Sequence, residues 1–262
     1  MEKGVPIRSL QRGLAVLQAV NRGGSLTMME IARASVVPYP TACRIVQTLQ
    51  VEGLIEQEPT RKRYRPTGLV QTLSHGYQDH TRLVQIARPH IVELTRRVIW
   101  PISLSTHVGA SMVIRDSTHS LTSLTFNHYF PGYSIPILEC ASGLVYLAYM
   151  DEQERSGILA SLKRLPERVS IHILQQIEHG SLISDVIDQG YASRWNNSFT
   201  RNPGKTSSIA VPIMDNGHVC GALTLGFFST AMRMNDAIAQ FVEPLKEAAL
   251  EISADLVSSQ KN

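Results

Sequence analysis

A short segment from Tyr39 to Thr48 carries polar side chains at a spacing that could contact the edges of DNA bases. Arg44 and Gln47 stand three positions apart, with Thr41 before them. Arginine can donate two hydrogen bonds to guanine in the major groove, and glutamine can pair with adenine in a similar two-bonded way. Residues three and four positions apart share one face of a helix. The segment therefore predicts a helix whose outer face binds DNA.

Three consecutive cations follow this segment and could contact phosphates. Arg61, Lys62 and Arg63 stand between two strand-like runs, so we expect them near the tip of a β-hairpin, as in a wing. Phosphate contacts add affinity more than sequence choice. The alternatives are an ordinary hairpin with a solvated tip, and a helix face that contacts phosphates alone. The candidate DNA contacts are Arg8, Arg12, Thr27, Tyr39, Pro40, Thr41, Arg44, Gln47, Thr48, Arg61, Lys62 and Arg63.

The distribution of charge along the chain supports this prediction. Residues 1–67 hold ten Lys and Arg against five Asp and Glu, whereas the remaining residues hold fifteen against seventeen. Positive charge concentrated in one small segment is what phosphate binding needs, although chance clustering on a solvated surface would give the same count.

Three helices and a hairpin are expected to position these side chains. The apolar spacing predicts helices over Ser9–Val20, Thr27–Ser35 and Thr41–Glu52, then a short strand over Leu54–Glu58 that returns at Tyr64–Pro66. A short helix, a tight turn and a helix with a polar outer face are typical of a helix-turn-helix. We therefore predict a winged helix-turn-helix domain at residues 1–67.

Local signals mark the ends of these helices. Thr27 and Glu30 fit a capping box, in which each side chain binds a backbone N–H at the helix start. Pro38 and Pro40 prevent the second helix from continuing, and Pro40 suits the first turn of the third. Gly53 is the expected stop of that third helix.

Residues 68–98 are predicted to be a helical linker region, which Gly76 and Pro89 divide. Its apolar stripe could face a second subunit. A second apolar stripe lies along one side of the last predicted helix, Asn235–Val257. Two such helices exceed what one small sheet needs to cover, so we expect an oligomer.

The rest of the chain, residues 99–262, alternates in the manner of an α+β domain with a mainly antiparallel sheet. Strands are predicted at Ile102–Val108, Met112–Arg115, Leu121–Phe126, Ser207–Met214 and Val219–Phe228. An Asn-Gly pair joins the last two strands, and such a pair is a strong hairpin signal.

Helices complete this domain. We expect a buried helix at Ala141–Met150 and two polar helices between Asp151 and Gln189.

Catalytic and metal-binding chemistry is not indicated. A Gly-x-Ser-x-Gly elbow is absent around Ser142, and no phosphate loop or dinucleotide fingerprint occurs. All nine histidines lie beyond residue 67, without the spacing of a helix-borne zinc site, so neither a metal nor a cofactor is expected. The protein is not expected to be an enzyme.

The cysteines and the apolar segments favour the cytoplasm. Cys43, Cys140 and Cys220 are widely spaced and odd in number, so no disulfide framework is indicated. The longest apolar stretch, Ile135–Met150, is interrupted by polar residues and is too short to span a membrane.

Several motifs in fixed order resemble the IclR-type transcription regulators over nearly the whole chain. In the first part the resemblance rests on three motifs: residues 9–14 (SLQRGL), 26–32 (LTMMEIA) and 41–44 (TACR). In the second part it rests on residues 136–143 with Ala141-Ser142-Gly143, on Gly190-Tyr191, and on residues 208–213 (SIAVPI) followed by 221–223 (GAL). The branch that regulates the degradation of hydroxyphenylpropionate and related aromatic acids looks closest. That narrower resemblance rests on Val98-Ile99-Trp100-Pro101 with Ser105-Thr106, together with Ala141-Ser142-Gly143-Leu144.

The resemblance implies a winged helix-turn-helix, a linker helix and a GAF-like effector domain. It implies dimers, with tetramers as an alternative, on double-stranded operator DNA of a catabolic operon. RNA polymerase is a further candidate partner, and activation and repression both remain open. DNA binding without a ligand is the competing hypothesis, but two thirds of the chain lie outside the DNA-binding part.

The resemblance also indicates an effector pocket, with two departures from the family pattern. Leu144 stands where the family has Lys, and Arg194-Trp195 stands where it commonly has acidic residues. Arginine can clamp a carboxylate and an indole can stack on a ring, so we predict an aromatic carboxylic acid, with a non-aromatic metabolite as the alternative. The candidate effector contacts are Phe130, Tyr133, Ala141, Ser142, Arg194, Trp195, Thr206, Ser208, Thr224 and Gly226. Phe130 and Thr224 could instead be core or surface residues, and Arg194 could be in a surface ion pair.

Overall fold

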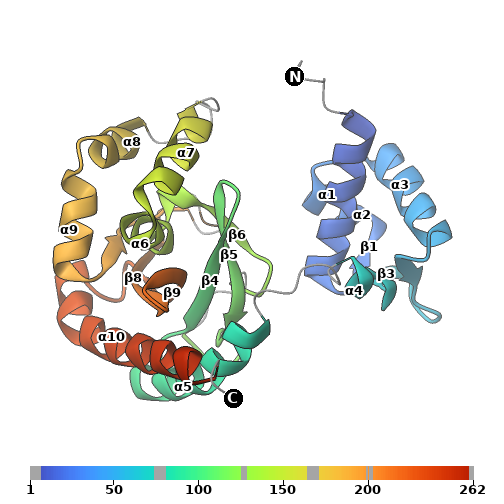
Figure 1. Ribbon diagram of the computed structural model, residues 1–262. Helices are drawn as coiled ribbons and strands as arrows, with labels where there is room; N and C mark the ends of the chain where they lie inside the picture. The colour runs from blue at the N-terminus through green and yellow to red at the C-terminus, as the bar shows by residue number, and fades with distance from the viewer. Residues whose placement is uncertain are drawn as a thin grey trace. The chain divides into compact units, whose positions relative to one another are not determined.

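The computed structural model describes residues 7–73, 81–124, 129–163, 171–198, 200 and 203–259. The chain divides into two compact units, residues 1–79 and 80–262. Figure 1 labels the elements of each unit.

Among the described residues, the first unit has three longer helices, one short helix and a small antiparallel sheet. Its helices are α1 (Arg8–Gly23), α2 (Met28–Ser35), α3 (Tyr39–Val51) and the short α4 (Leu69–Thr72). The strands are β1 (Leu26–Thr27), β2 (Ile55–Gln57) and β3 (Arg63–Pro66), in the order β1-β3-β2. This is the winged helix-turn-helix that the sequence predicts.

Apolar residues of α1, α2 and α3 meet in the core of this unit. Val16, Val20, Ile31 and Val46 are almost fully buried there. The capping box at Thr27 is confirmed: the Thr27 hydroxyl accepts from the Glu30 N–H, and Glu30 accepts from the Thr27 N–H at 2.8 Å. The hydrogen bond from the Thr27 backbone N–H contributes most to lowering the pKa of Glu30, and the bond to the Thr27 side chain lowers it further.

The second unit is built on a six-stranded antiparallel sheet in the order β6-β5-β4-β9-β8-β7. Its strands are β4 (Ile102–Val108), β5 (Ser111–Ser117), β6 (Ser134–Pro136), β7 (Ala192–Arg194), β8 (Thr206–Asp215) and β9 (His218–Phe228). The turn between β8 and β9 has positive φ at Asn216 and Gly217, as the predicted Asn-Gly hairpin requires.

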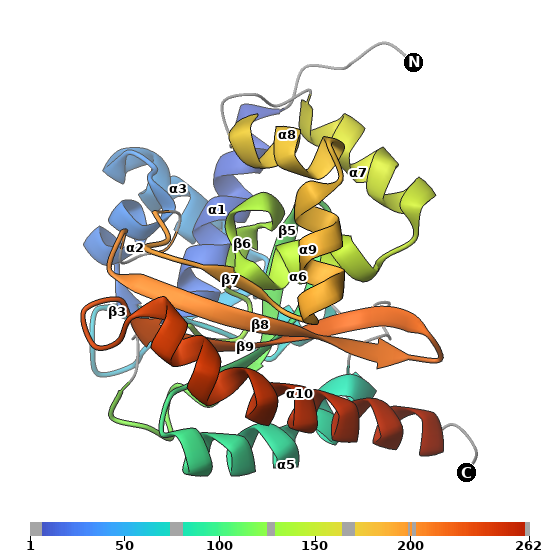
Figure 2. The same ribbon diagram turned by 90° about the vertical axis from the view of Figure 1, so that its left-hand side faces the viewer.

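Helices cover both faces of this sheet (Figures 1 and 2). On one face lie α5 (Thr81–Val98) and α10 (Met234–Ser258), which pack against each other and against the aliphatic side of the sheet. On the other face α6 (Ala141–Tyr149) packs on β8 and β9. The helices α7 (Glu152–Lys163), α8 (Ile171–Glu178) and α9 (Ser181–Gln189) belong to the same side. The predicted α+β class with an antiparallel sheet is confirmed.

Three predictions for this unit are wrong in detail. The helix α5 continues through Pro89, because its buried face, with Leu83, Ala87 and Ile91, holds the helix against the sheet despite one lost hydrogen bond. Residues 121–124 form bends rather than a strand, while 125–126 lie outside the described residues, as does Gly76. In the described residues between Asp151 and Gln189 there are three helices, α7, α8 and α9, where the sequence predicts two.

The apolar stripes of α5 and α10 are buried within the unit itself. They therefore provide no argument for a second subunit. Among the described residues, no helix is long and apolar enough to cross a membrane.

Candidate DNA-binding surface and effector cavity

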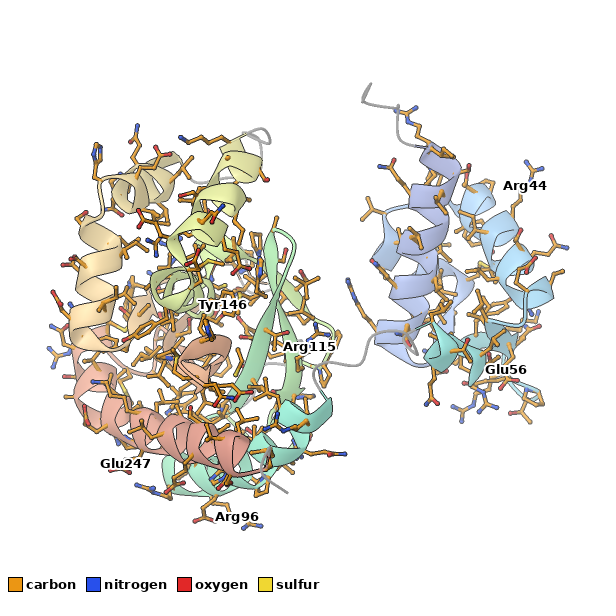
Figure 3. All side chains as sticks on the ribbon, in the orientation of Figure 1. Arg44, Glu56, Arg96, Arg115, Tyr146 and Glu247 are labelled. Atoms are coloured by element: carbon orange, nitrogen blue, oxygen red, sulfur yellow. The ribbon has the colours of Figure 1, made fainter. Side chains whose placement is uncertain are left out.

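The helix α3 buries one side and exposes the side that the sequence predicts to contact DNA. Ala42 and Val46 are buried in the core of the unit. Figure 3 shows Arg44 projecting away from the body of the unit. The candidate contacts on this helix that lie exposed are Tyr39, Pro40, Arg44, Gln47 and Thr48, and Thr41 is half-buried. The arrangement leaves a polar and cationic ridge open to a partner.

The hairpin β2–β3 places two of its three cations in solvent. Arg61 and Lys62 are exposed. Arg63 instead donates to the Ser25 carbonyl oxygen at 2.9 Å and pairs with Glu30 at 3.0 Å, so it ties the hairpin to the start of α2. Arg63 therefore stabilises the position of the hairpin and is less available than Arg61 and Lys62 to contact DNA.

The remaining candidates of this unit differ in role. Arg8 and Arg12 are exposed on α1. The Thr27 hydroxyl is engaged in the capping box, which fixes the start of α2.

The two faces of the large sheet differ sharply in side-chain size. On β4, Ile102 and Leu104 belong to the aliphatic core under α5 and α10. Ser103 and Ser105 point to the other face, where they line a cavity beneath the start of α6. The same alternation on β8 and β9 brings further small and hydroxylated residues to this cavity: Thr206, Ser208, Thr224 and Gly226.

This cavity has the lining of a small-molecule site, with mostly apolar walls and a few polar groups between them. Its apolar walls come from Met112, Ile114 and Ile135, and Tyr129 adds an aromatic ring. Among the described residues that line it, none carries a charged side chain.

The corner between a 3-10 turn, η1 (Ile137–Glu139), and α6 forms one wall of the cavity. Cys140 is the N-cap of α6 and provides no side-chain cap. The N–H groups of Gly143 and Leu144 bind the Cys140 carbonyl oxygen, so those of Ala141 and Ser142 are left for other partners. Ala141 and Ser142 both line the cavity, which therefore receives the positive end of a helix dipole.

A buried ion pair fixes this corner to the far edge of the sheet. Arg194 on β7 donates to Glu139 at 2.7 Å and to the Leu138 carbonyl oxygen at 3.3 Å. Asn197 donates to the Glu139 carbonyl oxygen at 2.7 Å. Glu139 is 2% exposed and Arg194 22% exposed, so the pair is largely shielded from water.

Six of the ten predicted effector contacts line the cavity: Ala141, Ser142, Thr206, Ser208, Thr224 and Gly226. The other four lie elsewhere. Tyr133 contacts the rings of both Tyr129 and Phe130 in tilted or edge-on geometry, with ring centroids 5.5 Å apart for Tyr129 and Tyr133 and 6.3 Å apart for Phe130 and Tyr133. Arg194 is held by Glu139, and Trp195 lies half-exposed in a separate shallow groove beside the start of α10.

The structure adds cavity residues that the sequence argument did not select. They are Ser103, Ser105, Ser117, Tyr129 and Asn197. A run of alternating serines on a predicted strand, Ser103 and Ser105, was the available signal. Burial raises the pKa of Tyr129 to about 12 and that of the Cys140 thiol to about 11, so both groups stay neutral at physiological pH.

A winged helix-turn-helix with an exposed cationic helix, joined to a unit that contains a cavity lined by apolar and hydroxyl side chains, is the architecture of a ligand-responsive transcription regulator. The sequence pattern of the IclR helix-turn-helix domain matches residues 9–59, and that of the bacterial transcriptional regulator IclR C-terminal domain matches residues 75–254. The chain belongs to the IclR family of transcriptional regulators.

Individual relatives agree with this assignment. The transcriptional regulator XynR of Escherichia coli is 24% identical over 95% of this chain and 97% of its own length. The fold resembles that of an IclR homologue from Microbacterium hydrocarbonoxydans, solved with 4-hydroxybenzoate (TM-score 0.67, 22% identity, 95% of this chain and 98% of the other). It also resembles Thermotoga maritima IclR (TM-score 0.64, 23% identity, 95% and 98%). The family consists of regulators rather than enzymes, and its members bind DNA and small-molecule effectors.

Proposed function

We propose that this chain controls a catabolic operon in response to an aromatic carboxylic acid that binds in the cavity of the second unit. The observation that carries the proposal is the uncharged, partly apolar cavity that Ala141 and Ser142 line at the start of α6, where the first backbone N–H groups have no partner within the helix. A helix N-terminus of this kind binds anions through its N–H groups and its dipole. The ligand carboxylate then needs no cationic side chain.

The walls of the cavity suit an aromatic ring. Met112, Ile114 and Ile135 provide apolar surface, and Tyr129 provides a ring for an edge or offset contact. The Microbacterium relative of similar fold was solved with 4-hydroxybenzoate, which is an acid of this class. The competing candidate is a small non-aromatic acid, which would use the same helix N-terminus but leave the apolar walls uncovered.

Calorimetry on the full chain tests this proposal. We expect benzoate or phenylpropionate, or their hydroxylated forms, to bind with a negative heat-capacity change that pyruvate does not produce. Stronger binding of pyruvate than of every aromatic acid would show that the ligand class is wrong.

The variant Ala141→Pro tests the carboxylate site. Proline is tolerated at the first position of a helix, and Cys140 already has the extended backbone (φ −132, ψ 149) that precedes proline. The variant therefore removes one N–H at a position whose backbone conformation already suits proline. We expect at least about tenfold weaker binding of the acid, with an ordinary melting curve. Unchanged binding would place the carboxylate elsewhere.

The DNA-binding side of the proposal rests on the exposed face of α3. We expect Arg44→Ala to weaken operator binding by about 1–3 kcal/mol and to relax sequence preference, because a base contact with two hydrogen bonds is lost. Competition binding at fixed salt against a scrambled duplex measures this. Arg96→Ala is the charge-matched control, since Arg96 is 74% exposed in the second unit and pairs with the exposed Glu93 at 3.5 Å. Equal losses on both duplexes would mean that Arg44 contacts phosphates alone.

We further propose a dimer that forms through α1. Ile7, Leu10 and Leu14 are 65%, 58% and 51% exposed and follow one another at helical spacing. Covering such a stripe with a second copy would bury apolar surface and supply the two-fold symmetry that helix-turn-helix operators require. Light scattering should show a dimer for the native chain and a monomer for the double variant Leu10→Ser, Leu14→Ser. A native monomer with full operator affinity would contradict this proposal.

A further inference from the structure

Two hydroxyl groups in the cavity are buried without a hydrogen-bond partner. They are Ser105 Oγ on β4 and Thr224 Oγ1 on β9. Both residues line the cavity, and Ser105 is only 3% exposed. A buried hydroxyl without a partner loses its bonds to water and gains nothing in return, so it destabilises the fold unless a ligand supplies the missing bond.

Four other hydroxyls of the same cavity do have partners. Ser142 donates to Cys140 Sγ at 3.3 Å, and Ser117 Oγ accepts from the His119 N–H at 3.2 Å. Thr206 and Ser207 are also hydrogen-bonded. The lack of a partner is therefore not common to every hydroxyl of the cavity.

The pairing of the strands brings the two free hydroxyls together. Ser103 lies opposite Thr224, and Ser105 lies opposite Ala222, so Ser105 and Thr224 are diagonal neighbours on the cavity face. Such neighbours are about 7–8 Å apart at Cα, and their side chains can both reach one small polar group between them. The β4–β5 register also shifts between Leu104 and Ser105, an irregularity of the kind that redirects side chains at binding sites.

We propose that Ser105 determines the specificity of this cavity: with Thr224 it binds a hydroxyl group on the ring of the effector. This inference rests on the proposed function, because it takes the aromatic acid as given and adds a second polar group to it. A phenolic hydroxyl can donate to one of the two side chains and accept from the other, which satisfies both at once. The effector is thereby a hydroxylated aromatic acid, and its unsubstituted analogue leaves the buried pair unsatisfied.

Calorimetry with two matched ligand pairs tests the proposal: 4-hydroxybenzoate against benzoate, and hydroxyphenylpropionate against phenylpropionate. At least one hydroxylated acid should bind the native chain about 10- to 100-fold more tightly than its partner, at about tenfold for each hydrogen bond. Ser105→Ala should remove about tenfold of that preference and leave the unsubstituted acid unchanged. Ser161→Ala, an exposed serine on α7 that binds the Gly157 carbonyl oxygen, is the control and should behave as the native chain.

The possible failures are distinguishable. If both members of each pair bind equally to the native chain, or if Ser105→Ala weakens both equally, this inference is overturned while the aromatic acid stands. If no aromatic acid binds, the proposed function fails and this inference fails with it.

A measurement without ligand provides a second test. Because the Ser105 hydroxyl has no hydrogen-bond partner within the protein, Ser105→Ala should melt at the same temperature as the native chain or slightly above it. A melting temperature several degrees lower would show that the hydroxyl has a structural role, and the specificity role would be wrong.

Discussion

Replacement of Arg194 by alanine should destabilise the effector unit rather than simply abolish ligand binding. The guanidinium donates to Glu139 at 2.7 Å, and Glu139 is 2% exposed, so the variant leaves a carboxylate buried without its cation. Breaking a buried pair in this way costs about 3–5 kcal/mol. Because Arg194 itself is 22% exposed and water can partly replace it, we expect the lower end, about 3 kcal/mol. At about 2–4 °C per kcal/mol for a unit of this size, the melting temperature should fall by about 6–12 °C.

Differential scanning calorimetry of the full chain measures this fall, and a cavity ligand identifies which transition belongs to the second unit. Arg97→Ala is the matched control, because Arg97 pairs with Glu247 at 3.4 Å with both side chains more than half exposed. Such an exposed pair is worth at most about 1 kcal/mol, so the control should shift by less than about 4 °C. An Arg194→Ala protein that melts normally but no longer binds the acid would refute this reasoning. It would restore the sequence-based prediction that Arg194 clamps the ligand carboxylate.

Two further predictions concern the corner between η1 and α6. Gly143→Ala should lose about 1–3 kcal/mol of unfolding free energy in denaturant titration, because a Cβ there would overlap the Ile137 carbonyl oxygen and lie 2.7 Å from its carbonyl carbon. Stability equal to that of the native chain would mean that the corner shifts freely. The Cys140 thiol, buried and with a pKa raised to about 11, should resist iodoacetamide at pH 8 in the native chain and react once the chain is denatured, as mass spectrometry can follow. Rapid native alkylation of Cys140 would show that the corner opens.

Features that depend on a few neighbouring residues were predictable from the sequence. The capping box at Thr27 and Glu30 and the hairpin at Asn216 and Gly217 both appear where the sequence places them. In each case the reason is local: a side chain that satisfies a nearby N–H, or a backbone that needs positive φ. Pro89 shows the limit of such rules, since the packing of the whole α5 face outweighs one missing hydrogen bond.

Features that join distant segments were not predictable in this way. Arg194 is recognisable as a cation near a pocket motif, but its partner Glu139 lies 55 positions away in the sequence, in the turn η1. Only the folded arrangement shows that this guanidinium is already paired with Glu139. The start of α6 is therefore the better binding site for the carboxylate of a ligand.

The strand β4 was predicted from the sequence, but its contribution to the cavity was not, and its two faces explain why. Alternation of aliphatic and serine residues over Ile102–Ser105 predicts a strand with two unlike faces, and the usual inference places the serines in water. In this sheet both faces are covered, so Ile102 and Leu104 pack under α5 and α10 while Ser103 and Ser105 are buried beneath α6. A small polar residue on a strand with both faces covered does not contribute to solubility. Its hydroxyl either forms a hydrogen bond within the fold or is available to bind a ligand. Ser105 has no hydrogen-bond partner, so we assign it to ligand binding.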